Sequence, residues 1–575
     1  MAEPSIDRVQ VPRPPRGEGQ WAFGYREPLN AAEQTKKDQD SLDVYERILH
    51  YAATGEPIFV ADLRSRFRSY GIYTQRPESD GFLMMRIRIP GGVLTSEQLR
   101  TIGELSRDIG RDVADVTDRQ NVQLHWVRIA DVPRIWERLE AVGLNTLEAC
   151  GDVPRNILGC ALAGVDADEV LDATPLVYAV NERLTGTKEF SNLPRKYKMS
   201  ITGCRHQCAV HEANDVGLVA HQLDDGRVGF DVWVGGGLSS TPHFAQRLGV
   251  FVPPEEVVEV CVAITAIFRD YGYRRSRNRA RLKFLVADWG AATFREVLEA
   301  YLGRGLVDGP EAKPSDETHR DHTGVGRQHD GLNYLGFAMR TGRTSGSDLV
   351  ALADLADRVG KGRLRLTAQQ KVVLLDVPDD RLAETMDSLE SLGYPVFASP
   401  FRTGAMACTG IEFCKLAIVE TKHRATQITE ELERRLPGFD EPLRINVNGC
   451  PNSCARYQLA DIGFMGVLVS ERTNGDGSST KLEGFNVHVG GHLGAQRRFG
   501  RKVRGVRLRA DELVSFAERL IGIYLDERRG QRSFGEWIVT HTDQQIDAIA
   551  KRAAKGLERV GPPPVAADEI RPEDD

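Results

Sequence analysis

Two stretches in the second half of the chain decide its fold: MACTGIEFCKLA at residues 406–417 and NVNGCPNSCAR at residues 446–456. They contain two pairs of cysteines, which are Cys408 with Cys414 and Cys450 with Cys454. Paired thiolates hold zinc or an iron–sulfur cluster, and zinc knuckles favour about two to four residues between paired cysteines. The first pair has five residues between its members, which favours a cluster. Four reduced core cysteines are a poor alternative, because core cysteines seldom pair beside glycine and proline.

The pattern C-x5-C followed by N-G-C-P-N-S-C resembles the assimilatory sulfite and nitrite reductases, which are ferredoxin-dependent sirohaem enzymes. The resemblance covers nearly the whole chain after the first twenty residues. It implies that Cys408, Cys414 and Cys450 hold one 4Fe–4S cluster, while Cys454 bridges this cluster and the sirohaem iron. It also implies that electrons come from a separate protein, ferredoxin, since the sequence contains no dinucleotide fingerprint.

Length and composition set limits on the class of protein. A chain of 575 residues exceeds what one hydrophobic core supports, so two to four domains are expected. The sequence contains no apolar run of about eighteen residues, so no membrane span is expected. Nine cysteines, an odd number, argue against a disulfide framework and for a reducing, cytoplasmic setting. The formal charge of −7 argues against a nucleic-acid partner.

A helix pattern and the turn after it occur twice. In the first copy Thr95 and Gln98 form a capping box, and apolar residues then recur at helical spacing. The two matching apolar sets are Leu99, Ile102, Leu105 and Ile109, and Leu349, Leu352, Leu355 and Val359. Eight residues after each set, T-D-R-Q begins at Thr117 and T-A-Q-Q begins at Thr367. Both copies then continue through a strand into a second helix.

A second match lies further along each half. GCRHQCAVHEANDVGLVA at residues 203–220 aligns with GCPNSCARYQLADIGFMG at residues 449–466, and VWVGGG at 232–237 aligns with VHVGGH at 487–492. The chain is therefore predicted to be an internal duplication. Two such copies can hold a ligand between them, because each contributes one wall.

The duplication and the resemblance together predict an α+β fold. Two small ferredoxin-like αβ modules are expected to form a shared central domain, flanked by two larger α/β sirohaem-binding domains. The expected segments are a disordered leader at 1–20, an N-terminal extension at 21–79, paired half-domains at 80–148 and 331–398, larger domains at 149–330 and 399–560, and a tail at 561–575.

Four cations occupy positions that match the substrate-binding residues of the family: Arg86, Arg155, Lys196 and Lys198. An isolated arginine or lysine is usually a solvated surface charge, and only the resemblance argues otherwise here. If residues 196–200 are extended, Lys196 and Lys198 point to the same face and can reach one anion. Sulfite reductases of this family tend to have lysine where Lys198 stands, and plant nitrite reductases asparagine, so sulfite is favoured over nitrite.

Sirohaem carries eight carboxylates, so its pocket should be rich in cations and hydrogen-bond donors. Two stretches fit: DRQNVQLHW at residues 118–126, and RRSRNRARLKF at residues 274–284. The residues expected to contact the cofactor are Arg119, Gln120, Asn121, Gln123, His125, Arg281 and Lys283. His125 equally fits a hydrogen-bonded core histidine. Outside this context the second stretch would indicate a solvated helix face or a nucleic-acid patch.

The first half contains cysteines that the family cluster does not use. Cys204 and Cys208 repeat the C-x3-C spacing, and Cys150 and Cys160 bring the number of thiols to four. A second cluster would depart from the family, and the spacing from Cys150 to Cys160 does not copy C-x5-C. A trace of the duplication is the preferred interpretation, and Cys261 is expected in the core. The resemblance also places Cys150 and Tyr73 near the active site, which allows a tyrosine–cysteine thioether as a hypothesis beside two separate pocket residues.

The resemblance thus implies six-electron reduction of sulfite to sulfide in sulfate assimilation. The alternatives are nitrite reduction to ammonia and a non-catalytic iron–sulfur electron relay, which would leave the pocket cations without a role. A monomer is expected. The stretch RRFGRKVRGVRLR at residues 497–509 has seven basic residues and no acidic one, and is a candidate docking site for an acidic ferredoxin.

Overall fold

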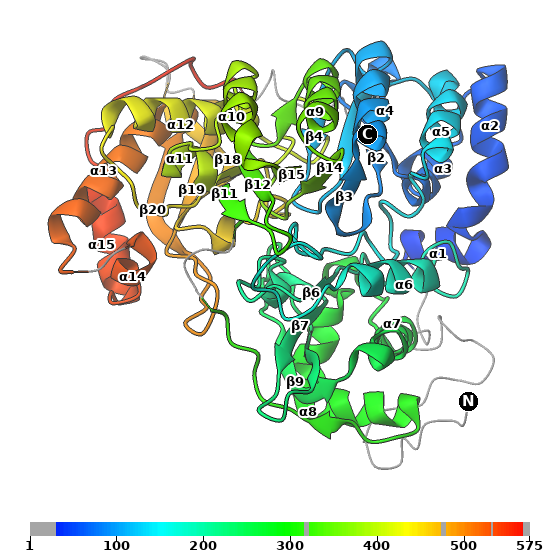
Figure 1. Ribbon diagram of the computed structural model, residues 1–575. Helices are drawn as coiled ribbons and strands as arrows, with labels where there is room; N and C mark the ends of the chain where they lie inside the picture. Colours follow the sequence, from blue (N-terminus) through cyan, green and yellow to red (C-terminus); the bar gives the residue numbers. More distant parts are fainter. Residues whose placement is uncertain (1–29, 316–320, 473–478, 531–532, 567–575) are drawn as a thin grey trace.

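The computed structural model describes residues 30–315, 321–472, 479–530 and 533–566 (Figure 1). The predicted leader at 1–20 lies outside the described residues, as do residues 567–575 of the predicted tail. Within the described ranges, no helix is both long enough and apolar enough to cross a membrane.

The described strands form four five-stranded sheets. The central domain contains two of these sheets. In spatial order, the first consists of β1 (Ile72–Thr74), β2 (Leu83–Ile87), β5 (Val122–Val127), β4 (Ala114–Val116) and β13 (Arg343–Thr344). The second consists of β11 (Gly324–Arg327), β12 (Asn333–Ala338), β15 (Lys371–Val377), β14 (Arg363–Leu366) and β3 (Val93–Thr95). Each larger domain contains one sheet. The sheet of the first consists of β10 (Val307–Asp308), β9 (Gln246–Val252), β8 (Val228–Val234), β7 (Val216–Gln222) and β6 (Met199–Thr202). The sheet of the second consists of β16 (Ala405–Ala407), β17 (Ile445–Asn448), β18 (Ile462–Arg472), β19 (Ser479–Val489) and β20 (Arg501–Arg509).

Helices cover these sheets on their outer faces (Figure 1). Those of the N-terminal part and the first half are α1 (Ala31–Asp38), α2 (Tyr45–Thr54), α3 (Val60–Arg64), α4 (Ser96–Asp108), α5 (Val132–Ala141), α6 (Thr174–Leu184), α7 (Val257–Tyr271) and α8 (Leu282–Leu302). Those of the second half are α9 (Gly346–Val359), α10 (Leu382–Ser391), α11 (Pro400–Gly404), α12 (Lys422–Arg435), α13 (Leu513–Glu527), α14 (Phe534–Ile538) and α15 (Asp543–Ala553).

The two half-domains exchange a strand. β3 belongs to the first half but pairs with β14 of the second sheet, with Thr95 opposite Arg363. β13 belongs to the second half but pairs with β4 of the first sheet, with Thr344 opposite Ala114. Apolar residues of both halves form one continuous core, while each larger domain has a core of its own. The predicted α+β fold with a shared central domain is therefore confirmed, and Figure 1 shows the larger domains below and to the left of it.

The exchanged strands lead directly into the helices that join the halves. Thr95 ends β3 and caps α4: its Oγ1 accepts a hydrogen bond from the N–H of Gln98 at 3.2 Å, as the capping box predicts. Ser345 caps α9 in the same way after β13. The two helices pack closely at Gly103, where a Cβ atom would lie 2.6 Å from the carbonyl oxygen of Gly346.

The sheets of the central domain begin earlier in the chain than the predicted boundaries at residues 80 and 331. β1 pairs with β2, and β11 pairs with β12, so both strands belong to these sheets. They are three and four residues long, too short for their apolar periodicity to be recognised in the sequence. The N-terminal extension is also anchored, because Glu33 of α1 forms a buried ion pair with Arg274 at 2.9 Å.

The two larger domains have equivalent strand pairings and hydrogen bonds. β6 pairs in parallel with β7, and β17 pairs in parallel with β18. In the first copy the backbone N–H of Lys198 donates to Asp215 Oδ2 at 2.8 Å, and in the second the N–H of Arg444 donates to Asp461 Oδ2 at 2.8 Å. Lys198 and Arg444 are thus equivalent, which extends the duplication from the sequence to individual hydrogen bonds.

Close packing of α4 on α9 predicts that Gly103→Ala destabilises the protein by about 1–3 kcal/mol, because the added methyl group would overlap Gly346 and Val350. Denaturant unfolding of the full chain measures this difference. Gly522→Ala in α13 is the matched control: a Cβ atom added there would have no neighbour within 4 Å, and the change should stabilise that helix by about 0.5–1 kcal/mol. Equal effects of the two substitutions would contradict the proposed close contact.

Candidate active site between the two halves

Two equivalent glutamines fix the central domain to the larger domains. Gln120 accepts a hydrogen bond from the N–H of Gly159 at 3.0 Å and donates to the carbonyl of the same residue at 3.2 Å. Gln370 makes the matching pair of hydrogen bonds with Ala407: it accepts from the N–H of Ala407 at 3.2 Å and donates to the carbonyl of Ala407 at 3.0 Å. Both glutamines have positive φ, near +54° and +59°, in the T-D-R-Q and T-A-Q-Q turns. The turns therefore set the position of the residues that follow Gly159 and Ala407, which are Cys160 and Cys408.

The four predicted cluster ligands lie on two loops after β16 and β17. Backbone N–H groups point at their sulfurs: Gly449 N–H donates to Cys408 Sγ at 3.2 Å, and Leu416 and Ala417 donate to Cys414. Burial, with Cys454 adding to it, raises the pKa of Cys408 to about 12 and that of Cys450 to about 11. These thiols must lose their protons to bind metal, so a cluster would bind with release of protons.

Cys454 differs from the other three because it is exposed. Its loop neighbours Asn452, Ser453 and Arg456 line a pocket whose other walls come from the first half of the chain. The first-half residues lining this pocket are Asp118, Arg119, Leu158, Lys196, Lys198, Val210, Ala213, Asn214, Leu238 and Arg281. The pocket thus lies between the two halves, as the duplication predicts, and Cys454 lies beside it.

The charge in this pocket is strongly positive: among the described lining residues, five cations face one carboxylate, that of Asp118. Burial, together with the nearby cations Arg119 and Lys196, lowers the pKa of Lys198 to about 7, against the opposing effect of Asp118. Burial and Arg281 likewise lower the pKa of Lys196 to about 8, while Cys454 acts to raise this pKa. Such lysines gain a proton when an anion arrives and can release one near neutral pH.

The other two predicted substrate cations form a group around Tyr73 and Cys150. Arg86 donates to the hydroxyl of Tyr73 at 2.7 Å, and Tyr73 and Cys150 hydrogen bond to each other. Burial by itself would raise the pKa of the Cys150 thiol, but Arg155 and Arg86 hold it below its usual value. Cys454 interacts electrostatically with both Arg86 and Lys196, so the two groups of cations face the same cysteine.

The predicted sirohaem contacts occupy different environments. Arg119 and Arg281 line the pocket, and Arg281 pairs with Asp215 at 2.7 Å. Lys283 donates to the carbonyls of Leu238 and Thr241 beside the pocket.

The remaining predicted contacts hydrogen bond within the protein. Gln120 and Asn121 bond to backbone groups. Gln123 bonds Arg86 and the hydroxyl of Thr409. His125 is fully buried, 3.0 Å from Asp115 Oδ2 and stacked on Phe413. In this structure His125 has the bonding of a core histidine, the alternative left open by the sequence.

Arg456 and Asn214 line the pocket but were missed in the sequence analysis. Arg456 follows Cys454 in C-A-R, and its position after the last cysteine was the only available signal. Asn214 accepts a hydrogen bond from Arg119 at 2.9 Å and so orients that guanidinium group. Nothing in the sequence around Asn214 distinguishes it from an ordinary turn residue.

The basic stretch at 497–509 divides into two parts. Arg497 lies over the ring of Trp233, and Phe499 stacks on Phe244, so the beginning of the stretch packs against the first larger domain. Arg501 forms ion pairs with Asp543 and Asp547 of α15. The exposed cations of β20 are Lys502, Arg504 and Arg507.

Family models match most of the chain. The model described as "Nitrite and sulphite reductase 4Fe-4S domain" matches residues 150–306 and 400–542. The model described as "Nitrite/Sulfite reductase ferredoxin-like half domain" matches residues 75–142 and 325–392. Each model matches twice, once in each half of the duplication.

Individual relatives agree with this assignment. The chain is 48% identical to the sulfite reductase (ferredoxin) of Mycobacterium tuberculosis strain H37Rv, over 93% of this chain and 99% of that protein. It is 36% identical to the assimilatory ferredoxin-dependent nitrite reductase of Haloferax mediterranei, over 90% of this chain and 93% of that protein. The solved structure of the Mycobacterium tuberculosis NirA protein superposes with a TM-score of 0.86 at 47% identity, covering 92% of this chain and 100% of that one. The chain belongs to the nitrite and sulphite reductase family.

Proposed function

We propose that this protein reduces sulfite to sulfide, using a sirohaem coupled through Cys454 to one 4Fe–4S cluster and electrons from a ferredoxin. The observation that carries the proposal is the buried cationic pocket between the halves, which lies beside the exposed Cys454. We take a monomer as the working unit. The nine cysteines are all described and free, which suits a reducing compartment such as the cytoplasm.

The residues of the pocket fit a polyanionic cofactor. The Nε atom of Arg119 and the hydroxyl of Ser453 are buried and have no hydrogen-bond partner among the described residues. Unpaired donors in a pocket of buried cations are expected where a ligand with many carboxylates completes the bonding. Arg119, Arg281 and Arg456 would hold these carboxylates, while Cys408, Cys414, Cys450 and Cys454 would hold the cluster. Asp118 is the sole carboxylate among the described lining residues, which agrees with this ligand.

When bound, the two cofactors would supply the electrons and the iron at which the substrate is reduced. The chain itself would supply charge, orientation and protons. Lys196 and Lys198 would bind the oxygens of the anion, and their lowered pKa values suit proton transfer to an oxygen that leaves as water. Arg86 is held by Tyr73 and Gln123, so its guanidinium group is pre-oriented for the substrate.

Lys198 supports sulfite over nitrite as the substrate. Sulfite carries more negative charge than nitrite near neutral pH, so a second ammonium group stabilises sulfite more. Lys198 is partly buried near Lys196, Arg119 and Arg281, and the mutual repulsion of these cations is relieved most by the more highly charged anion. Nitrite reductase activity is the alternative that the experiment below separates.

Lys198→Asn should lower kcat/KM for sulfite by roughly 10- to 100-fold, the loss expected for one charge-assisted hydrogen bond. The same substitution should lower kcat/KM for nitrite far less. Steady-state assays with reduced methyl viologen measure both values, since this small donor bypasses protein docking. Equal losses on both substrates would show that Lys198 does not discriminate, and a wild-type enzyme that prefers nitrite would refute the sulfite assignment.

We also propose that ferredoxin docks on the exposed cations of β20. Lys502, Arg504 and Arg507 alternate with the buried residues Val503 and Val506, so their side chains face solvent on one side of the edge strand. Weak redox complexes depend on charge steering, and an acidic ferredoxin would be attracted to this side. Arg501 is excluded because α15 already neutralises it.

Reversal of Lys502, Arg504 and Arg507 to glutamate should lower ferredoxin-driven turnover by roughly 10-fold or more at low salt and remove most of its salt dependence. Turnover with methyl viologen should persist. The matched control reverses Arg134, Arg183 and Lys188, three exposed cations of the first half, and should leave both donors equally effective. Loss of turnover with both donors would show that the β20 cations serve the fold or the cofactors instead.

The contact between Tyr73 and Cys150 supports the thioether hypothesis. Their hydrogen bond brings the phenol and the thiol together, and Arg86 and Arg155 favour the thiolate. Formation of the carbon–sulfur bond removes two hydrogen atoms, so it requires an external oxidant such as dioxygen.

Peptide mass spectrometry of the purified holoenzyme should therefore find the peptides of Tyr73 and Cys150 joined, with a mass lower than their sum by two hydrogen atoms. Tyr73→Phe lacks the hydroxyl that activates the ring and should yield separate peptides. Two unmodified peptides from the wild-type protein would dispose of the hypothesis.

A further inference from the structure

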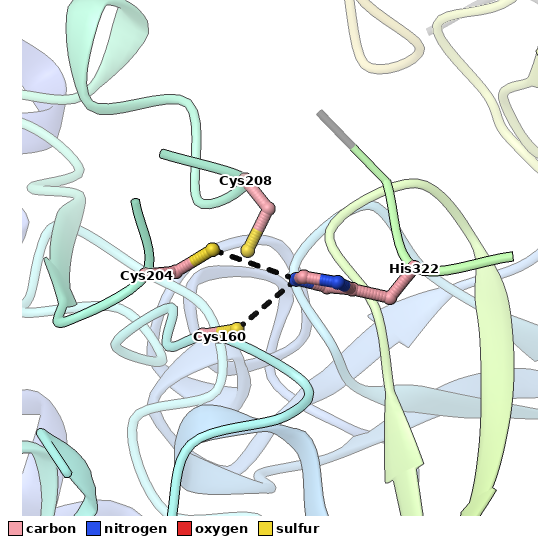
Figure 2. A group of neighbouring side chains, drawn as sticks. All are labelled: Cys160, Cys204, Cys208 and His322. Carbon is pink, nitrogen blue, oxygen red and sulfur yellow. Dashed lines mark hydrogen bonds between the residues drawn. The ribbon is translucent and has the colours of Figure 1, made fainter. Parts of the chain in front are cut away.

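Three cysteines and one histidine meet away from the pocket described above. Figure 2 shows the sulfurs of Cys160, Cys204 and Cys208 directed at the ring of His322. The Nε2 atom of His322 lies 3.1 Å from Cys160 Sγ and 3.6 Å from Cys204 Sγ. All four potential ligand atoms lie within 4.8 Å of one another, and all four residues are buried. No other group of three or more histidine, cysteine or acidic side chains in the described ranges comes this close together.

The three cysteines occupy the positions of the cluster ligands in the other half. Cys204 and Cys208 align with Cys450 and Cys454. Cys160 follows Gly159 and Cys408 follows Ala407, and these two preceding residues are bound by the equivalent glutamines Gln120 and Gln370. The first copy thus places three thiols where the second copy places three cluster ligands.

The fourth ligand position, that of Cys414 in the second copy, has no cysteine in the first copy. Cys414 lies six residues after Cys408, but six residues after Cys160 the chain has Asp166. Asp166 instead forms an isolated backbone bridge with Gln328, in the turn between β11 and β12. His322 lies in the segment that joins β10 to β11, and the Nε2 end of its ring points at the three thiols (Figure 2). Cys150, which the sequence analysis grouped with these thiols, does not join them and hydrogen bonds to Tyr73.

The spacing of the ligand atoms suits one ion. A tetrahedral zinc ion has Zn–S bonds of about 2.3 Å and Zn–N bonds of about 2.0 Å, which places its ligand atoms about 3.5–3.8 Å apart. The observed separations of 3.1 and 3.6 Å, within a group no wider than 4.8 Å, are close to this arrangement. A four-iron cluster inserts several iron and sulfide atoms among its thiolates and needs a wider opening.

The surroundings also favour a structural metal. Leu162, Val373 and Leu375 pack around the thiols and exclude water. The N–H of Leu162 donates to Cys160 Sγ at 3.3 Å, as backbone groups do around metal-bound thiolates. Cys3His is a standard ligand set of closed zinc sites. Burial of three thiols and an imidazole away from water is costly, and a divalent cation bound among them would offset that cost.

We propose that Cys160, Cys204, Cys208 and His322 bind a single zinc ion in a second, structural metal site. The ion would join three segments that are distant in the sequence: the loop before α6 that contains Cys160, the turn after β6 that contains Cys204 and Cys208, and the interdomain linker between β10 and β11 that contains His322. His322 lies just before β11, and its carbonyl oxygen is so close to Gly336 of β12 that a Cβ there would lie 1.7 Å from it. The site would therefore tie the linker and the second half-domain to the first larger domain.

Metal analysis of the purified full-length holoenzyme tests this proposal. Inductively coupled plasma mass spectrometry should find about one zinc per chain in the wild-type protein, in addition to the iron of the sirohaem and the cluster. The double variant Cys204→Ser/His322→Ala should lose this zinc. Cys261→Ser is the matched control: Cys261 is a buried cysteine on α7 outside the group, and its variant should keep the zinc.

Zinc-edge X-ray absorption of the wild-type protein makes the test independent of whether the variants fold. The proposal predicts a shell of three sulfurs near 2.3 Å and one nitrogen near 2.0 Å, within about 0.2 Å. Wild-type protein without zinc, whether it holds extra iron or a disulfide among the three cysteines, would overturn the proposal. So would zinc with only nitrogen and oxygen ligands, or zinc that persists in the double variant.

Discussion

Burial of several cations in one pocket is the constraint on which the rest of this structure depends. Arg119, Lys196, Lys198, Arg281 and Arg456 converge between the halves, with Asp118 as the single carboxylate among the described lining residues. Like charges in a buried site repel each other and resist desolvation, as the lowered pKa values of Lys196, Lys198 and Arg119 show. The fold can hold this arrangement because two interlocked half-domains fix the walls, and a polyanionic ligand would relieve the repulsion. The same polyanionic ligand would therefore both stabilise the pocket and be required for its function.

Duplication explains how such a pocket arises and why its two sides differ. Equivalent hydrogen bonds, such as Lys198 to Asp215 and Arg444 to Asp461, hold the same framework in both copies. On that framework the second copy has four cysteines on the loops beside the pocket. The first copy has both lysines and two of the three arginines of the pocket, and it places its three equivalent cysteines with His322. One half is therefore suited to electron transfer, and the other to anion binding and to a separate metal site.

The duplication could be predicted from the sequence because it depends on local patterns. The capping box at Thr95 and the apolar positions of α4 and α9 are examples. The fold class followed from the duplication together with the family resemblance and is confirmed, while the cysteine ligand set stays a prediction of that resemblance. Strand exchange was not predictable, since β3 and β13 are three and two residues long and pair with the opposite half. Side-chain roles were harder still. Gln120 was expected at the cofactor, but in this structure its amide bonds three backbone carbonyls that meet only after folding.

His322 illustrates the same limit for the second metal site. Its distance along the chain from Cys160, Cys204 and Cys208 is more than one hundred residues, and it lies in a linker rich in charge and proline. No spacing rule connects a ligand at such a distance. The cysteine spacing alone also argued against a site, because Cys150 took the place of the missing partner. Only the tertiary arrangement shows which thiols meet and which residue completes the set.

Anomalous diffraction at the iron edge, from a crystal of the holoenzyme, tests the central claim most directly. The account predicts a cluster of irons among Cys408, Cys414, Cys450 and Cys454, and one further iron next to Cys454 in the pocket lined by Lys196 and Lys198. Absence of iron from that pocket, or a haem iron without Cys454 beside it, would contradict the claim that the cationic pocket between the two halves holds the sirohaem.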